Sequence, residues 1–253
     1  MDTDAARQMT DLITEGNQHL DQRFRTSVQK ESLLLFFKVS KKNNQMCISL
    51  EVSIGAAVLN AATCGYLFLR NEEGDRFLSV SLGYIGTMQW LEAAMWMDQS
   101  CGTLNRTATE IAKWQNSLQP LVFLACAYFL SRKGFKWWMC VPFVLVAYFT
   151  LPNLLTAETG CSLPCEGGKG EGLSWKYTAT NGLAGWLLFA VSLSVPLLSL
   201  PGRRGVYFFT ASMVVYAAAM LLAKERCDTK GNITAGSLWC LLGSAMPLLG
   251  LAV

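Results

Sequence analysis

The chain has 253 residues, of which 52% are hydrophobic and only 15% are charged, with a mean hydropathy of +0.29 and a formal net charge of +3. Soluble proteins carry close to a quarter charged residues, and so small a net charge gives no signature of polyanion binding. These values exclude a disordered chain, a cytosolic enzyme and a nucleic-acid-binding module. No nucleic-acid partner is therefore expected.

The first 45 residues form an N-terminal extension. They lack a basic segment followed by an apolar stretch, so no signal peptide is expected. The segment 31–40 (ESLLLFFKVS) is apolar but too short to span a bilayer. It predicts a short amphipathic or apolar helix that lies on the membrane surface or packs against the core, with a frayed tail as the alternative.

Seven apolar windows follow in residues 46–253. Each is long enough, or nearly so, to cross a bilayer as a helix with a rise of about 1.5 Å per residue. They are continuously apolar rather than alternating, which favours helices over barrel strands. Of the 39 charged residues, 37 lie outside these windows. The sequence therefore predicts an all-α polytopic membrane bundle, with the lipid bilayer as its partner. The predicted spans are 46–69, 77–97, 114–130, 137–156, 181–200, 206–223 and 235–253.

The orientation of the bundle depends on which signal is followed. The two sets of loops carry equal numbers of Lys and Arg, so the positive-inside rule leaves the basic tail to decide and places the N-terminus in the cytoplasm. The loops after the second, fourth and sixth windows, however, hold every loop cysteine and both Asn-x-Thr sequons, at Asn105 and Asn232. Such features suit an oxidising compartment, and on this basis we favour an outside or lumenal N-terminus. The side of these three loops is termed the cysteine face.

The loop cysteines are candidates for a disulfide. Pairing of Cys101 with Cys161 or Cys165 would connect the second loop to the fourth, whereas a Cys161–Cys165 bridge would close a very small loop and stabilise little. Free thiols and a four-thiolate zinc site that includes Cys227 are the alternatives, although the spacings match no strong zinc pattern. No metal site and no cofactor is predicted.

A carboxylate inside a membrane span is costly and is by default a functional hypothesis. Glu92 lies in the second window, about 8 Å below the cysteine face by helical rise. Gln89, Glu92 and Trp96 are spaced i, i+3, i+7 and share one side of a helix. We expect this side to face the interior, with Trp90 or Trp96 as a wall of the site.

The third window begins with a second polar stripe, in which Gln115 and Gln119 are spaced i, i+4. Because the second and third windows form an antiparallel hairpin, we expect the Glu92 carboxyl to bond to one of these amides, directly or through one water. Further polar residues enter the windows from the same side, namely Glu51, Asn153 and Asn181. Together they predict a polar pocket that opens towards the cysteine face. The alternative is structural, since Gln and Asn also fasten membrane helices to one another.

Missing residue types exclude several chemistries. The only histidine, His19, lies in the extension, which excludes multi-histidine zinc hydrolases, haem ligation and histidine acid–base catalysis. The last window has no lysine for a retinal Schiff base. No catalytic residue is predicted, and a membrane lipid-modifying enzyme is the least favoured function, because no nucleophile–base pair is evident.

Several short motifs occur in a characteristic order. They are Met88-Gln89-x-x-Glu92-x-x-x-Trp96, Cys101-x-x-Leu104-Asn105, Gln119-Pro120 and Gly236-Ser237-Leu238-Trp239-Cys240. In order and spacing they resemble a family of multi-pass membrane proteins from large DNA viruses of protists, their hosts and some bacteria. The resemblance covers about residues 46–253 and implies a fold but no activity, because the family has none assigned. It draws attention to Gln89, Glu92, Gln119 and Trp239.

The leading hypothesis for the function is an intramembrane polar pocket that binds a proton, a cation or a small polar ligand for transport or sensing. Glu92 would bear the charge, Gln89, Gln115 and Gln119 would orient it, and Trp96 and Trp239 would complete the site. The alternative is a structural or assembly protein whose polar cluster only fixes helix packing. The sequence indicates neither the ligand nor the oligomeric state.

Overall fold

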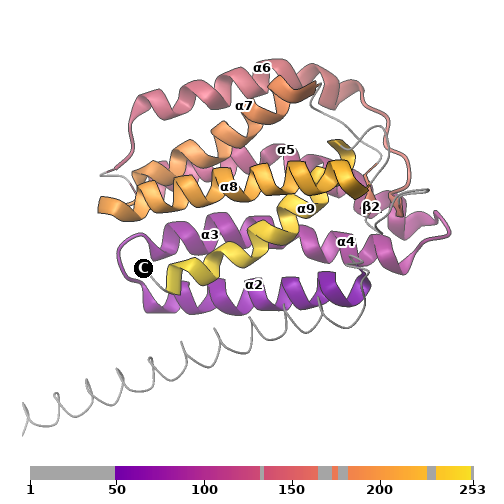
Figure 1. Ribbon diagram of the computed structural model, residues 1–253, viewed down its shortest axis with the longest axis horizontal. Helices are drawn as coiled ribbons and strands as arrows, with labels where there is room; N and C mark the ends of the chain where they lie inside the picture. Colours follow the sequence, from indigo (N-terminus) through magenta and orange to yellow (C-terminus); the bar gives the residue numbers. More distant parts are fainter. Residues whose placement is uncertain (1–48, 132–133, 165–172, 176–181, 227–231, 252–253) are drawn as a thin grey trace, which may run out of the picture. The chain divides into compact units, whose positions relative to one another are not determined.

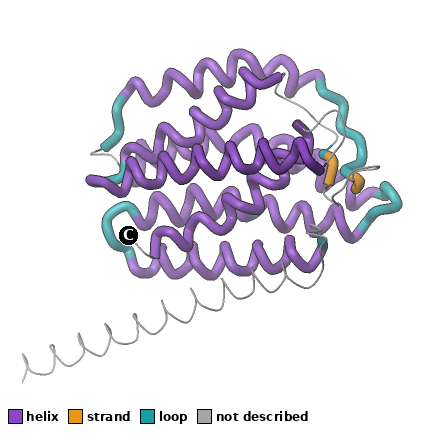
Figure 2. Tube along the Cα trace, viewed as in Figure 1, coloured by secondary structure: helices purple, strands orange, loops and turns teal. Residues whose placement is uncertain are grey.

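Helices occupy each of the seven apolar windows in a computed structural model that describes residues 49–131, 134–164, 173–175, 182–226 and 232–251 (Figures 1 and 2). The N-terminal extension, Cys165, Cys227 and Asn181 lie outside the described residues. The helices and their bounds, in chain order, are α2 (Leu50–Arg70), α3 (Asp75–Gly86), α4 (Met88–Met97), α5 (Thr103–Leu130), η1 (Trp137–Met139), α6 (Cys140–Thr156), α7 (Gly182–Ser194), η2 (Val195–Ser199), α8 (Gly202–Arg226), α9 (Asn232–Ala245) and η3 (Met246–Leu251).

Local sequence explains several of the helix ends. The Ser49 hydroxyl accepts a hydrogen bond from the Val52 amide and caps α2, as expected for a serine at an N-cap. Two α-helices change to 3₁₀ geometry beside prolines, α7 at Pro196 and α9 at Pro247. Proline lacks the amide donor and disfavours α geometry in the preceding residue, so both helices tighten at the same point relative to their proline.

The second predicted span is two helices rather than one, because α3 ends at Gly86 and α4 begins at Met88. Thr87 lies between them, and its hydroxyl donates to the Tyr84 carbonyl oxygen at 2.7 Å. A Cβ atom at Gly86 would overlap the side chain of Asn60 on α2. The missing side chain at Gly86 therefore allows α2 and the α3–α4 junction to approach closely.

The third predicted span is longer than its apolar window, since α5 begins at Thr103 rather than near residue 114. Asp98 holds the start of α5 by accepting from the backbone amides of Gly102 and Asn105, both at 3.1 Å. These bonds, that from Asn105 foremost, and one from the Ser100 hydroxyl lower the pKa of Asp98. The first turns of α5 thus extend the bundle beyond the apolar windows at the cysteine face.

Helix α9 packs against four other helices of the bundle: α2, α3, α4 and α8. On the other side, α6 packs against α7 and α5, and lies at the edge of the bundle in Figure 1. The interior between these helices holds large side chains that are fully buried, including Phe77, Phe123, Phe208 and Trp239. Phe77 and Phe123 meet edge to face with ring centroids 6.4 Å apart.

The loop after α6 contains a short hairpin that the sequence analysis did not predict. Strands β1 (Leu163–Pro164) and β2 (Leu173–Ser174) pair antiparallel, with Leu163 opposite Ser174. Leu173 and Trp175 are buried, and β2 contacts α9. The loop therefore covers part of the bundle end at the cysteine face.

Three helices in the described residues are long and apolar enough to cross a membrane: Leu50–Arg70, Trp137–Thr156 and the Gly202–Leu221 part of α8. Two shorter apolar helices are Ala184–Ser199 and Leu238–Leu251. The outer surface of these helices is itself apolar. On α6, for example, Tyr148 is 74% exposed and Leu155 65%. Water-soluble monomers rarely expose continuous apolar surface of this kind.

Candidate functional site

Glu92 lies on α4 and is completely buried, with 0% exposure. Its Oε2 atom accepts a hydrogen bond of 3.0 Å from the Gln89 amide nitrogen, one helical turn earlier. Gln89 is also fully buried, and its own oxygen, Oε1, has no hydrogen-bond partner among the described residues. The carboxyl and the amide therefore form a pair inside the bundle rather than at a surface.

A second pair of polar contacts joins α5 to α9. The indole nitrogen of Trp239 donates to Gln119 Oε1 at 3.3 Å, and Gln119 Nε2 donates to the Cys240 sulfur at 3.7 Å. All three side chains are buried. Both ends of the Gln119 amide are therefore occupied by α9, which gives this residue a fastening role.

The electrostatic influence of the Glu92 carboxyl extends to the Cys240 thiol, and that of the thiol to the Tyr216 hydroxyl on α8. Of the side chains in this region, Gln119 is the one that hydrogen-bonds to the Cys240 sulfur within the described residues. Tyr216 packs against Trp239 with ring centroids 5.3 Å apart, and its buried hydroxyl has no hydrogen-bond partner within the described part of the chain. The six residues of this group are termed the polar cluster: Gln89, Glu92, Gln119, Tyr216, Trp239 and Cys240.

The structure does not bring Gln115 to Glu92. Gln115 donates to the Tyr84 carbonyl oxygen at 3.0 Å and to the Thr87 hydroxyl, so it fastens α5 to the α3–α4 junction. Gln119, one turn later, bonds to Trp239 and Cys240 on α9 rather than to Glu92. The predicted hydrogen bond from Glu92 to Gln115 or Gln119 is therefore not found among the described residues, where the Glu92 carboxyl bonds to Gln89 instead.

The tryptophans of α4 differ from one another. Trp90 is 48% exposed, whereas Gln89 and Glu92 beside it on α4 are fully buried, so it is not a wall of the buried site. Trp96 is half-buried, and its indole N–H is buried without a hydrogen-bond partner among the residues described. No contact places its ring against the Glu92 carboxyl, and its predicted role there stays a prediction.

The other polar residues predicted near the pocket lie apart from it. Glu51 is exposed at the start of α2 and accepts from the Ser49 hydroxyl at 2.6 Å. Asn153 donates to the Phe149 carbonyl oxygen of its own helix at 3.3 Å. Neither contributes to the polar cluster.

Asn60 is an interior residue that the sequence analysis missed. Its amide nitrogen donates to the carbonyl oxygens of Leu82 at 3.2 Å and Ser244 at 3.0 Å, and thus joins α2 to α3 and α9. Its oxygen accepts from the Cys64 thiol at 3.7 Å. The signal was available, because Asn60 stands in the middle of the first apolar window.

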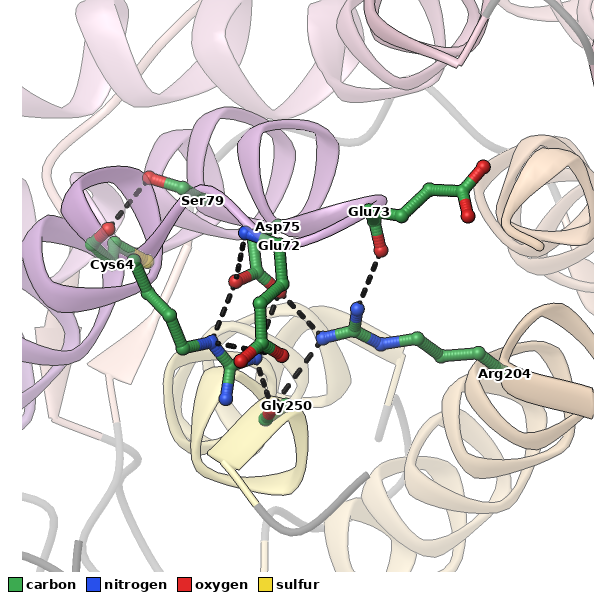
Figure 3. A network of polar contacts seen from close by, with 8 residues as sticks. Cys64, Glu72, Glu73, Asp75, Ser79, Arg204 and Gly250 are labelled. Atoms are coloured by element: carbon green, nitrogen blue, oxygen red, sulfur yellow. Dashed lines mark hydrogen bonds and ion pairs between the residues drawn. The ribbon is translucent and has the colours of Figure 1, made fainter. Parts of the chain in front are cut away.

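A buried ionic cluster lies at the end of the bundle opposite the cysteine face (Figure 3). Asp75 accepts two hydrogen bonds from Arg70, at 2.6 and 2.8 Å, and one from Arg204 at 2.6 Å. Both arginines also donate to the Gly250 carbonyl oxygen, at 2.9 and 3.4 Å. Arg204 further donates to the Glu73 carbonyl oxygen at 2.6 Å. These contacts hold the α2–α3 turn, the start of α8 and the C-terminal η3 together.

The ionic cluster sets the charge of Asp75. Its side chain has no exposed surface, and those of Arg70 and Arg204 are almost fully buried. Burial alone raises the pKa of Asp75, but the hydrogen bonds and charges of Arg70 and Arg204 outweigh it and hold the pKa below its ordinary value. Asp75 is therefore an ionised carboxylate with two cationic partners.

At the cysteine face, Cys101 and Cys161 form a disulfide with Cα atoms 5.5 Å apart. This is one of the two loop-to-loop pairings predicted for Cys101. Next to it Asn105 is fully buried, donating to the carbonyl oxygens of Met95 and Ser162 and accepting from the Ser162 amide. Its sequon is thus closed to glycosylation in the folded chain.

Comparisons of the chain with protein-family models, with curated proteins and with solved structures find no significant match. The resemblance to the multi-pass membrane family therefore stays a prediction. The functional argument accordingly rests on the geometry of the polar cluster.

Proposed function

We propose that the chain is a polytopic membrane protein of seven spans, and that Glu92 is the proton-binding centre of its interior, used for proton-coupled transport or pH sensing. The apolar outer surface of helices such as α6 supports insertion into lipid, because exposed apolar side chains are at their most stable there. The placement of charges supports it as well, since Glu51 and Glu92 are the only charged residues inside the seven predicted spans.

The observation that carries the proposal is the complete burial of Glu92 with its carboxyl hydrogen-bonded to the Gln89 amide. Burial disfavours the charged form of a carboxyl, whereas hydrogen bonds donated to it favour that form, so a buried carboxyl binds and releases its proton in response to its surroundings. Hard metal cations prefer a shell of several oxygen ligands, usually with more than one carboxylate, whereas Glu92 is the one carboxylate among the six residues of the polar cluster. Among a proton, a cation and a small polar ligand, the cluster thus favours the proton.

Gln89 is suited to serve both protonation states of Glu92. Its nitrogen donates to an ionised carboxylate, and after a half-turn of the amide its oxygen accepts from a protonated one. In the structure the nitrogen faces Glu92 and the oxygen has no partner among the described residues. Rotation would therefore break no hydrogen bond of that oxygen.

The second candidate function is structural, and Gln119 favours it. Both polar atoms of its amide bond to α9, as an interhelical fastener requires. We assign this role to Gln119 and Trp239, and the proton-binding role to Glu92 and Gln89. Tyr216 and Cys240 would then be the neighbours through which the state of Glu92 affects α8 and α9.

The disulfide supports one orientation of the bundle. Disulfides persist in oxidising compartments, so the Cys101–Cys161 bridge favours a cysteine face that is outside or lumenal. An outside N-terminus goes with it, because the N-terminus of a seven-span chain lies on the same side as the loops after the second, fourth and sixth spans. In this orientation the ionic cluster of Asp75 lies on the cytoplasmic side.

Proton flux into sealed vesicles tests the transport form of the proposal. The full chain would be reconstituted into liposomes that contain a pH-sensitive dye, and an acid pulse would be applied outside. We expect flux above that of protein-free vesicles for the wild type and for Glu51→Gln, an exposed carboxyl changed in the same way, but not for Glu92→Gln. Equal flux in the wild type and Glu92→Gln would contradict the proposal.

A further inference from the structure

The end of the bundle opposite the cysteine face, here termed the opposite face, has an excess of positive charge. It consists of the loops after the first, third and fifth spans. In the sequence these loops hold seven basic and three acidic residues, whereas the loops of the cysteine face hold seven of each. The two faces therefore carry equal numbers of Lys and Arg, but the opposite face has fewer acidic residues and so a net positive charge.

The structure divides the charges of the opposite face into buried and exposed groups. Arg70 and Arg204 are used by the buried carboxylate of Asp75. Arg76, Lys136 and Arg203 are exposed, and none of them takes part in the ion pairs found among the described residues. Their charges are thus available to a partner outside the chain.

Two loops of the opposite face are held against one another, which brings Lys136 and Arg203 to the same region. The Ser131 hydroxyl donates to the Ser199 carbonyl oxygen at 2.6 Å. A Cβ atom at Gly134 would overlap that same oxygen, so the loop between α5 and η1 rests directly on the end of η2. Lys136 follows Gly134 by two residues, and Arg203 follows Ser199 by four.

Exposed aromatic rings adjoin these basic residues. Tyr128 contacts Phe129 and Phe135 with centroid distances of 4.8 and 5.4 Å, and Phe135 contacts Trp137 at 5.5 Å. Trp137 is 77% exposed, and Trp138 is 52% exposed. Tryptophan and tyrosine rings prefer the headgroup level of a bilayer, which is where lysine and arginine side chains meet lipid phosphates.

We propose that the opposite face binds anionic phospholipids, with Lys136 and Arg203 contacting the headgroup phosphates and Trp137 and Trp138 lying among the headgroups. This inference rests on the membrane insertion proposed above but not on the role of Glu92. It also agrees with the orientation favoured by the disulfide, because anionic lipids are concentrated in the cytoplasmic leaflet.

Lipid retention provides the test. The full chain would be reconstituted into mixed phosphatidylglycerol and phosphatidylcholine, extracted in mild detergent and examined by native mass spectrometry. We expect the wild type to retain phosphatidylglycerol preferentially. Loss of one basic residue should lower this preference about fivefold, the effect of about 1 kcal/mol per charge near an anionic surface, and Lys136→Gln/Arg203→Gln should lower it further. The matched control is Arg106→Gln, which removes an exposed arginine at the cysteine face and should leave the preference unchanged.

The possible outcomes separate the two proposals. A chain that inserts into both lipids without preference, or a double variant with the wild-type preference, would overturn the lipid inference alone. Failure to insert into phosphatidylcholine vesicles, measured as extraction by alkaline carbonate, would overturn membrane insertion itself. Competition by added inorganic phosphate would show that the face binds free phosphate rather than lipid, which would also overturn the inference.

Discussion

Two substitutions at Glu92 distinguish a proton-binding role of its carboxyl from a purely structural role in helix packing. The amide of Glu92→Gln keeps an oxygen to accept from Gln89, so the free energy of unfolding should change by less than about 1 kcal/mol. Glu92→Ala removes that acceptor and leaves the buried Gln89 amide unsatisfied, which costs about 1–3 kcal/mol. Thermal unfolding of the purified variants in detergent would measure both. A loss in Glu92→Gln as large as that in Glu92→Ala would instead indicate that the charge itself stabilises the fold.

Asp75 gives a prediction with a defined pH dependence. Asp75→Asn leaves two buried arginines without their anion and should reduce the free energy of unfolding by about 3–5 kcal/mol. Because the folded pKa of Asp75 lies below its ordinary value, its stabilisation is complete above the unfolded pKa of about 3.9 and is lost as the pH falls through the folded pKa. Unfolding temperatures at several pH values would show a loss in acid for the wild type that is smaller in Asp75→Asn.

The control for Asp75→Asn is Glu73→Gln. Glu73 takes part in the ionic cluster only through its carbonyl oxygen, and its side chain is exposed. Its substitution should change the unfolding temperature little at any pH. Equal effects of the two substitutions would contradict the account of Asp75.

Among single residues, the sequence predicted polar side chains that stand inside apolar windows. It did not predict pairs of residues that lie far apart in the chain. Glu92 and Gln89 could be found because polar side chains are costly inside an apolar window. Asp75 and Arg204 could not be paired, because they are separated by 129 residues and both lie between the predicted spans, where charged residues are usual. Gln115 was misassigned because spacing shows which residues share a helix side, but not which neighbour that side meets.

The approach of α2 to the α3–α4 junction predicts different effects for two glycines of α3. A Cβ at Gly86 would overlap the Asn60 side chain, whereas one at Gly83 would lie 3.6 Å from the Cys64 sulfur, an ordinary contact. Gly86→Ala should therefore reduce the free energy of unfolding by about 1–3 kcal/mol through overpacking, and Gly83→Ala should not. Thermal unfolding of the two variants measures the difference, and similar values would show that Asn60 moves aside freely.

Helices were predicted correctly where the sequence has a long, continuous apolar window. All seven apolar windows contain helices, as their continuously apolar rather than alternating pattern predicted. The early start of α5 escaped prediction, since it depends on Asp98, which lies outside that helix. The break at Thr87 also escaped prediction, because it interrupts a continuously apolar window without a proline. The hairpin of β1 and β2 has too few residues to give a pattern.

For the whole molecule, the disulfide predicts how the cysteines are distributed between bonded and free states. Proteolysis without reductant should yield a peptide pair linked through Cys101 and Cys161, while Cys64, Cys126 and Cys240 should react as free thiols after denaturation. Mass spectrometry of the alkylated digest distinguishes them. Recovery of Cys101 as a free thiol in protein isolated from its native membrane would contradict both the bridge and the orientation inferred from it.

The assembly of the bundle around α9 is the feature least accessible from the sequence. Trp239 was placed in the site without a partner, and Cys240 was not placed there, yet both are joined to Gln119 across about 120 residues. No periodicity encodes such a pairing.

The most direct test of the central claim is the infrared absorption of the Glu92 carboxyl. Difference spectra between acid and alkaline pH would be recorded for the chain in lipid nanodiscs, for Glu92→Gln and for the exposed control Glu51→Gln. The account predicts a carbonyl stretching band of a protonated carboxyl shielded from water, which disappears on alkalinisation, is absent from Glu92→Gln and is retained in Glu51→Gln. Identical difference spectra for the wild type and Glu92→Gln would contradict the claim that Glu92 is the proton-binding centre.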